Sequence, residues 1–300
     1  MQGLFKRYLW LVCQIKEAPN GINFEEINRR WKKNTNLNPM GEDLAKRTFR
    51  NWLAAIPEEL GVMIECDRRA PFNYYISDYG VDNVNMLKWS LEMYSVGNMA
   101  NENKSIYDRI LIDDVPSANQ NLAFICHAMR NNHKIILRYH RFGSEPTEYI
   151  VCPYAVKLFQ NRWYLIAHSE EKNKEYTYGV DRIISLEELD DKFVMPAKYS
   201  AKDKFNHSIG IYSDEEYPTE TVRLKVKGYL PDYFDTLPLH HTQVEECKGD
   251  DYVIYSYKLK ANYELVNRIM SYGTACEVLE PASLRTAIKS ALRSAYEIYD

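Results

Sequence analysis

The sequence lacks the features that place a chain in a membrane or in an oxidising compartment. It has no run of about 18 consecutive apolar residues, which a membrane-spanning helix needs. The N-terminal segment is interrupted by Gln14 and Lys16, and no small-residue cleavage site follows, so it predicts an amphipathic helix rather than a signal peptide. The six cysteines include no C-x-x-C pair, which indicates reduced thiols that act as small core residues and no structural zinc site. We therefore expect a cytoplasmic protein without a membrane partner, a metal or a cofactor.

The sequence also lacks the common catalytic signatures. It contains no G-x-x-x-x-G-K-[ST], no G-x-S-x-G and no H-E-x-x-H. The strongest candidate for acid–base or metal chemistry is His240-His241, with Asp232 and Asp235 nearby in the sequence. No second pair of ligands is spaced to match, so the pattern favours a surface loop. We expect no catalytic residues and no enzyme, and an enzyme with an unrecognised site is kept as an alternative.

Charge is present but unevenly distributed. The net charge of −4 excludes a chain that is basic throughout. Residues 1–80 hold 12 Lys and Arg against 10 Asp and Glu, a net of +2, and the remainder holds 26 against 32, a net of −6. A basic end on an acidic body indicates a localised anion-binding surface.

Residues 1–80 predict three helices followed by a β-hairpin. The third helix, from about Asp43 to Leu60, carries an apolar side that includes Phe49 and Trp52. After it, VMIEC and YYI alternate around a turn that holds Arg68 and Arg69. This order of elements is typical of a winged helix-turn-helix, whose exposed helix enters the DNA major groove.

The opposite side of the third helix supplies the candidate DNA contacts. Arg47 and Arg50 lie there, and Arg and Asn are the side chains that read guanine and adenine through paired hydrogen bonds. The alternative is a solvated helix face with no ligand. The predicted DNA-binding set is Lys46, Arg47, Thr48, Arg50, Asn51, Arg68 and Arg69.

The spacing of apolar residues divides the rest of the chain into three segments. Residues 81–132 predict a helical linker with Leu87, Leu91 and Tyr94 on one side. From about residue 133 the period changes to two, and successive short strands over 133–217 suggest a small closed barrel. Residues 218–300 alternate strands and helices, which predicts an α+β extension. The predicted fold class is therefore multidomain α+β.

The segment RWYLIAHSEEKNKEYTYGVDRI, residues 162–183, resembles the signature of the WYL-domain transcriptional regulators. Its Trp163-Tyr164-Leu165 follows IILRYHRF and EYIVCPYAVKLFQN, and YTYGVDRI closes the pattern. Tyr139, Pro153 and Arg182-Ile183 stand where the family has a tyrosine, a proline and a closing Arg-Ile. KRTFRNW at 46–52 is similar to the recognition helix of these regulators, and the likeness covers essentially the whole chain.

The resemblance implies a specific arrangement of domains and partners. It implies a winged helix-turn-helix, a helical linker, an Sm-like or SH3-like WYL barrel and a C-terminal extension, for which we expect a ferredoxin-like fold that could mediate dimerisation. The expected partners are a double-stranded DNA operator, a second copy of the chain, and a single-stranded nucleic acid or nucleotide effector at the barrel. Members include repressors and activators, and some accompany phage-defence genes.

The resemblance also implies the effector contacts, and the residue chemistry is compatible with them. Guanidinium groups pair with phosphates, and aromatic faces stack on bases. Trp163 is better explained as a core residue, and the alternative for Arg182 is a structural salt bridge. A second alternative function is a nucleic-acid-binding adaptor in which the barrel only dimerises. The predicted effector-binding set is Tyr139, Arg141, Arg162, Tyr164, His168, Tyr178 and Arg182.

Overall fold

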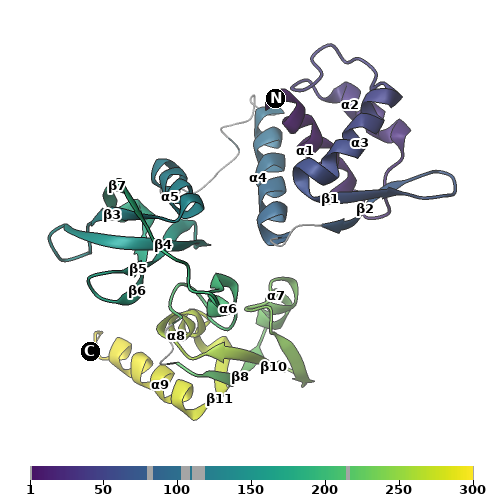
Figure 1. Cartoon of the computed structure of the whole chain (residues 1–300). Helices are drawn as coiled ribbons and strands as arrows, with labels where there is room; N and C mark the ends of the chain where they lie inside the picture. The colour runs from purple at the N-terminus through teal and green to yellow at the C-terminus, as the bar shows by residue number, and fades with distance from the viewer. Residues whose placement is uncertain (1, 80–83, 103–108, 110–118, 214–216, 300) are drawn as a thin grey trace. The chain divides into compact units, whose positions relative to one another are not determined.

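The computed structural model of the 300-residue chain describes residues 2–79, 84–102, 109, 119–213 and 217–299 (Figure 1). The chain separates into two compact units, Met1–Asp113 and Asp114–Asp300, and each is described by itself. The mixed α+β architecture with several sheets, predicted from the sequence, is confirmed. The predicted domain boundary between residues 80 and 81 lies outside the described residues.

The described residues of the first unit form three helices, a two-stranded antiparallel sheet and a further helix. The elements are α1 (Gln2–Lys16), α2 (Phe24–Lys33), α3 (Lys46–Leu60), β1 (Val62–Cys66), β2 (Tyr74–Tyr79) and α4 (Val84–Glu102). Three tryptophans connect the helices, since the Trp31 ring lies 5.2 Å from that of Trp10 and 5.3 Å from that of Trp52. Edge-on aromatic pairs of this kind add specific geometry to the burial of apolar area. The core therefore fixes α3 against α1 and α2.

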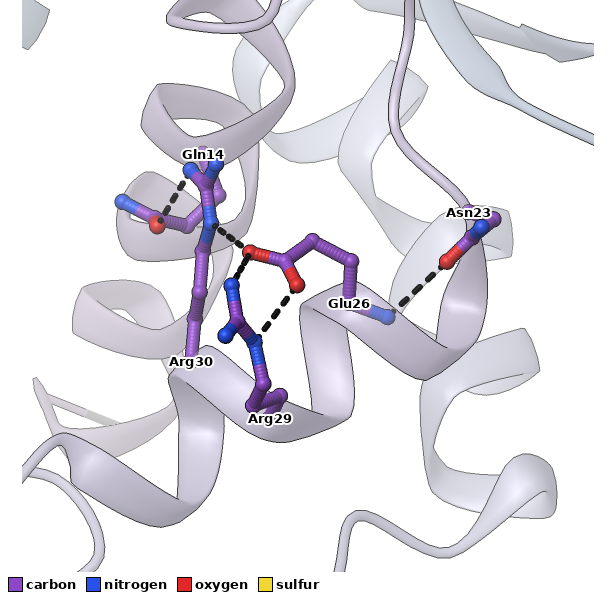
Figure 2. Close-up of polar contacts among 5 residues, drawn as sticks. All are labelled: Gln14, Asn23, Glu26, Arg29 and Arg30. Carbon is purple, nitrogen blue, oxygen red and sulfur yellow. Dashed lines mark hydrogen bonds and ion pairs between the residues drawn. The ribbon is translucent and has the colours of Figure 1, made fainter.

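The orientation of α2 depends on its first turn. The Asn23 side chain caps the helix by accepting a hydrogen bond from the Glu26 N–H at 2.9 Å. The Glu26 carboxylate accepts from Arg29 and Arg30, and Arg30 also donates to Gln14 of α1 (Figure 2). The hydrogen bonds from Arg29 and Arg30 lower the pKa of Glu26 to about 2. This network joins the exposed end of α2 to α1.

The second unit begins with α5 (Asn119–Asn131) and a five-stranded antiparallel sheet. The strands are β3 (His133–Tyr139), β4 (Thr147–Phe159), β5 (Arg162–Ser169), β6 (Lys174–Gly179) and β7 (Ile183–Lys192). Their order is β6-β5-β4-β3-β7, so the last strand returns to pair with the first. Ile125 of α5 is fully buried and belongs to the same core as Ile135 and Leu165 of the sheet. The short helix α6 (Ala201–Phe205) follows.

The C-terminal part of the second unit is a separate four-stranded sheet with helices. Its elements are β8 (Thr219–Lys227), α7 (Leu230–Thr236), β9 (Val244–Lys248), β10 (Tyr252–Lys260), α8 (Tyr263–Met270), β11 (Cys276–Glu280) and α9 (Ala282–Tyr296). The strand order is β11-β8-β10-β9, and all neighbours are antiparallel. Tyr255 and Tyr257 of β10 are almost fully buried in its core with Val222 and Leu224 of β8.

Two sequence predictions fail in this fold. Strand β9 was not expected, because the segment VEECK has no alternation of apolar and polar residues and all five residues are exposed. The expectation that every cysteine is a core residue is also wrong. Cys13 and Cys152 are buried, but Cys66 and Cys247 are exposed on β1 and β9, which present outward-facing positions to solvent. None of the described helices combines the length and the apolar character that crossing a bilayer requires.

Candidate functional site

Helix α3 separates its apolar and charged residues onto opposite sides. Phe49, Trp52 and Ile56 are buried. The predicted DNA-contacting residues Lys46, Arg47, Arg50 and Asn51 are all exposed, and Thr48 is half-buried. Lys46 is the first residue of the helix, so this polar surface covers its first two turns. The helix ends at Gly61, whose φ of 65° closes the last turn in a left-handed conformation.

The two other predicted DNA contacts lie on the hairpin that follows. Arg68 and Arg69 are exposed in the loop between β1 and β2. The loop has a defined backbone, because the Asp67 N–H donates to the Asn73 carbonyl and the Phe72 N–H donates to the Arg69 carbonyl, both at 2.9 Å. The structure thus presents cations on one helix and on the tip of one hairpin within the first unit.

A cavity of about 420 Å³ opens on the five-stranded sheet of the second unit. Four of the predicted effector residues line it: Tyr139, Arg141, Tyr178 and Arg182. The Tyr139 and Tyr178 rings meet edge to face with centres 5.1 Å apart. Burial raises the pKa of both phenols, so each stays protonated at neutral pH. The cavity size falls within the range of small-molecule sites.

Arg182 reaches this cavity from a short helical turn. Strand β6 ends at Gly179, and Arg182 closes the short 3₁₀ helix η2 (Val180–Arg182). Its guanidinium lies 5.1 Å from the Tyr139 ring centre and 4.5 Å from that of Phe142. Within the described part of the chain it forms no ion pair.

The other three predicted effector residues do not line the cavity. Arg162 forms an ion pair with Asp181 at 3.5 Å. His168 stacks on Tyr154, with ring centres 6.1 Å apart and an 18° angle between the planes. Tyr164 is half-buried, and burial raises the pKa of its phenol. Trp163 is partly buried against the core of the sheet.

Several cavity residues were absent from the sequence prediction. They include three lysines and three tyrosines: Lys172, Lys174, Lys204, Tyr149, Tyr176 and Tyr212. Lys204 of α6 pairs with Glu175 of β6 at 2.5 Å. Lys172 and Lys174 lie in or beside the turn EEKNKEY, whose charge was visible in the sequence. The contribution of α6 and of residues 211–213 depends on the tertiary fold and has no local signal.

Residues 211–213 form one wall of the cavity, and the segment 210–212 is fixed from two sides. The Lys157 ammonium of β4 donates to the Gly210 carbonyl at 2.6 Å. The Glu264 carboxylate of α8 accepts from the N–H groups of Ile211 and Tyr212 at 2.7 and 3.0 Å. Burial raises the pKa of Glu264 and lowers that of Lys157 to about 8. The wall is therefore connected both to the sheet of β3–β7 and to the C-terminal sheet.

The histidine pair is located on a loop, as the sequence favoured. His240 and His241 lie between α7 and β9 with ring centres 4.1 Å apart. His240 accepts from or donates to the Thr242 hydroxyl at 2.8 Å. Among the residues the structure describes, no group of three His, Cys, Asp or Glu side chains is arranged to hold a metal ion.

Comparison with known proteins identifies two domains in the chain. Residues 120–188 match the WYL domain, and residues 218–296 match the WCX domain. No curated protein matches the sequence. The chain is similar in structure to proteasome accessory factor B/C (PafBC) of Arthrobacter aurescens, with 17% identity, a TM-score of 0.36, and coverage of 98% of this chain and 47% of that one. It therefore spans about half the length of PafBC.

A second similar structure is described as a CRISPR Cas-related protein. It has 12% identity and a TM-score of 0.42, and the match covers 99% of this chain and 85% of the other. The two domain matches cover the five-stranded sheet with α5 and the four-stranded sheet with its helices. The chain therefore contains a WYL domain followed by a WCX domain.

Proposed function

We propose that the chain is a sequence-specific DNA-binding transcriptional regulator, without enzymatic activity, that acts in the cytoplasm. In this proposal the WYL barrel binds a nucleic-acid or nucleotide-like effector that changes operator binding. The observation that carries the proposal is the exposed face of α3, where Arg47, Arg50 and Asn51 lie opposite a fully buried face. A helix that exposes two arginines and an asparagine in this way suits the base edges of the major groove.

The first unit acts as a winged helix-turn-helix. Helices α2 and α3 form the helix-turn-helix, and the hairpin of β1 and β2 forms the wing. Arg47 and Arg50 contact base edges in the major groove, and Arg68 and Arg69 contact phosphates or the minor groove. Phosphate contacts set the position on the duplex, whereas base contacts set the sequence preference.

The sheet of β3–β7 acts as a small Sm-like barrel with the effector cavity on it. The pairing of β7 with β3 supports this assignment. Strands β3 to β6 pair with one another in succession, and β7 follows β6 in the chain but pairs with β3, at the other end of the series. The cavity combines the exposed rings of Tyr176 and Tyr212 with the charges of Arg182 and Lys174, whereas Tyr139 and Tyr178 are largely buried in the core of the sheet. Base stacking contributes about 1–3 kcal/mol per base, and a charge-assisted hydrogen bond about 1.5–3 kcal/mol.

The chain between the DNA-binding helices and the WYL barrel provides a route by which effector binding can change DNA binding. Helix α4 packs in the first unit, where the Cys13 thiol donates to the Leu91 carbonyl and Tyr94 donates to the Lys6 carbonyl. Helix α5 packs in the second unit. An effector regulates only if it binds the DNA-competent and DNA-incompetent states with different affinity. The segment 81–132, which contains both helices, is the element we expect to shift.

The regulator acts as a homodimer on an inverted repeat. The C-terminal part has the β-α-β-β-α-β order of a ferredoxin-like fold, and its last helix leaves Leu292 and Tyr296 exposed. Two-fold symmetric winged helices would read half-sites about one helical turn, roughly 10 bp, or a multiple apart. Sedimentation of the free and DNA-bound chain tests this, and a monomer under both conditions at micromolar concentration would contradict it.

Selection of duplexes from a random pool by the full-length chain tests the function as a whole. The expected result is enrichment of an inverted repeat. Arg47→Ala with Arg50→Ala should then abolish preference for that sequence. Recovery of no sequence preference by the wild-type chain would refute the proposal.

A further inference from the structure

The wing of the first unit carries an exposed aromatic residue in an unusual backbone conformation. Phe72 lies between β1 and β2 and is 55% exposed. Its φ of 57° is in the left-handed region, which bulky side chains rarely adopt. The Phe72 carbonyl accepts from the Cys66 thiol, and its N–H donates to the Arg69 carbonyl, so both of its backbone polar groups are fixed. A strained, exposed aromatic residue suggests a role for the ring outside the hydrophobic core.

The Phe72 ring lines a cavity of about 220 Å³ next to α3. The floor is aromatic, since the Phe49 ring centre lies 5.0 Å from those of both Phe24 and Tyr74. The rim of this cavity is charged and comes from two helices. It consists of Glu25 of α2 and of Lys46 and Arg50 of α3. The Lys46 ammonium lies 5.6 Å from the centre of the Phe24 ring. We call this cavity the methyl pocket and define it by Phe24, Glu25, Lys46, Phe49, Arg50, Pro71, Phe72 and Tyr74.

The mixed charge of the rim selects the kind of group that enters the methyl pocket. A phosphate would meet Glu25, whose carboxylate repels it and offers no donor. A base edge in the major groove suits the same rim, because Arg50 can donate to guanine acceptors and Glu25 can accept from an amino group. The aromatic floor remains to be filled by an apolar group. The C5 methyl of thymine is the apolar group that base pairs present in the major groove.

We propose that the methyl pocket receives a thymine methyl group beside the base contacted by Arg50, with Phe72 as a specificity-determining residue. The proposal rests on the proposed function, since it requires α3 to lie in the major groove. It adds that the wing reads sequence in the same groove as α3, in addition to contacting phosphates. The ring excludes water from the methyl group on the side that α3 leaves open.

Replacement of single thymines by deoxyuracil tests the proposal, because it removes only the methyl group. The full-length chain would be measured on its selected duplex and on duplexes with one deoxyuracil at each thymine position. At one thymine position in each half-site, replacement by deoxyuracil should weaken binding of the duplex to the wild-type chain about fourfold. This is the equivalent of about 0.8 kcal/mol for one buried methyl group. The Phe72→Gly variant should bind the thymine duplex and the deoxyuracil duplex with equal affinity. Glycine suits the left-handed conformation, so this variant removes the ring without adding strain.

A matched control separates the methyl pocket from a general loss of aromatic surface. Phe5 of α1 is 44% exposed in the same unit and does not line the pocket, so Phe5→Ala should keep the preference for thymine over deoxyuracil. The proposal is overturned if wild-type binding is insensitive to deoxyuracil at every position, or if Phe72→Gly keeps the full preference. Failure of the wild-type chain to select any duplex would instead refute the proposed function, and the methyl pocket with it.

Discussion

The Arg182 guanidinium lies 5.1 Å from the centre of the Tyr139 ring, on the wall of the larger cavity. The Tyr139 hydroxyl accepts a hydrogen bond from the Gly179 N–H at 3.0 Å, which fixes the ring relative to the turn that carries Arg182. A cation above an aromatic face is stabilised by the ring electrons, even where no carboxylate neutralises it. Tyr139 itself is only 6% exposed, so the pair presents the positive charge of Arg182 to the cavity, and Arg182 forms no salt bridge within the described residues.

Removal of Arg50 should weaken operator binding and relax its specificity. Arg50 is exposed on α3 opposite buried Trp52, so Arg50→Ala should cost about 1–3 kcal/mol and reduce preference at one base pair. Titration of the selected duplex and of its single-base variants measures both effects. Arg138→Ala on β3 removes an exposed arginine outside the first unit that does not line the larger cavity, and this variant should bind normally. Normal operator binding by the Arg47→Ala, Arg50→Ala double variant would show that α3 is not the recognition helix.

The arginines of the wing tip should influence affinity without strongly influencing sequence preference. Arg68 and Arg69 are exposed in the loop between β1 and β2. If each arginine neutralises one phosphate, each substitution should reduce the slope of log affinity against log salt concentration by about 0.9. Binding of operator and unrelated duplexes between low and moderate salt would measure this for Arg68→Ala and Arg69→Ala. An unchanged slope in the double variant would exclude phosphate contacts at the wing.

The lysines of the larger cavity should contribute to binding of single-stranded nucleic acid. Lys172 and Lys174 line the cavity, whereas Lys202 of α6 is exposed and does not. A fluorescent thymidine octamer should bind Lys172→Gln, Lys174→Gln more weakly than the wild-type chain. The salt slope should fall by about 0.7 for each phosphate that the variant no longer neutralises. Lys202→Gln should resemble the wild type, and equal binding by all three proteins would place the octamer elsewhere.

Acid should destabilise the fold through His240. Burial, reinforced by the nearby His241 and His207, lowers the pKa of His240 from its usual 6.5 to about 4. Between these values the unfolded chain binds more protons than the folded chain, so the free energy of unfolding falls as pH decreases through this range. His240→Gln removes the effect. Its thermal midpoint should therefore fall less than that of the wild type between pH 7 and pH 5.

The outcome for His240→Gln decides whether this histidine carries the pH dependence. If His240→Gln also shows the same decrease as the wild type, His240 does not titrate differently in the folded and unfolded chains.

Local patterns predicted the elements of the first unit with little ambiguity. The apolar side of α3 depends on residues three to four positions apart, so a single sequence contains it. The predicted end of α3 at Leu60 is confirmed, but the helix begins at Lys46 and not at the predicted Asp43. Strand β9 was not readable, because it pairs along a sheet edge through backbone groups and buries none of its side chains.

The larger cavity could be predicted only in part. Tyr139, Arg141, Tyr178 and Arg182 lie near the turns and strand ends that the WYL pattern marks, and the structure brings them together. Strand alternation could not show that His168 would stack on Tyr154 and would not line the cavity. The wall at 211–213 depends on Glu264, more than 50 residues further along the chain. Contacts of this separation leave no periodic signal in the sequence.

The central claim is that a ligand at the larger cavity changes DNA binding by the first unit. The most direct measurement is operator affinity of the full-length chain with and without a saturating thymidine octamer, for the wild type and for Arg182→Ala. The account predicts that the octamer changes wild-type affinity at least fivefold, the lower end of typical coupling between two sites. Arg182→Ala should bind the operator as the wild type does without octamer and should not respond to it. A folded Arg182→Ala protein that responds like the wild type, or a wild-type chain that binds the octamer with no change in operator affinity, would contradict the account.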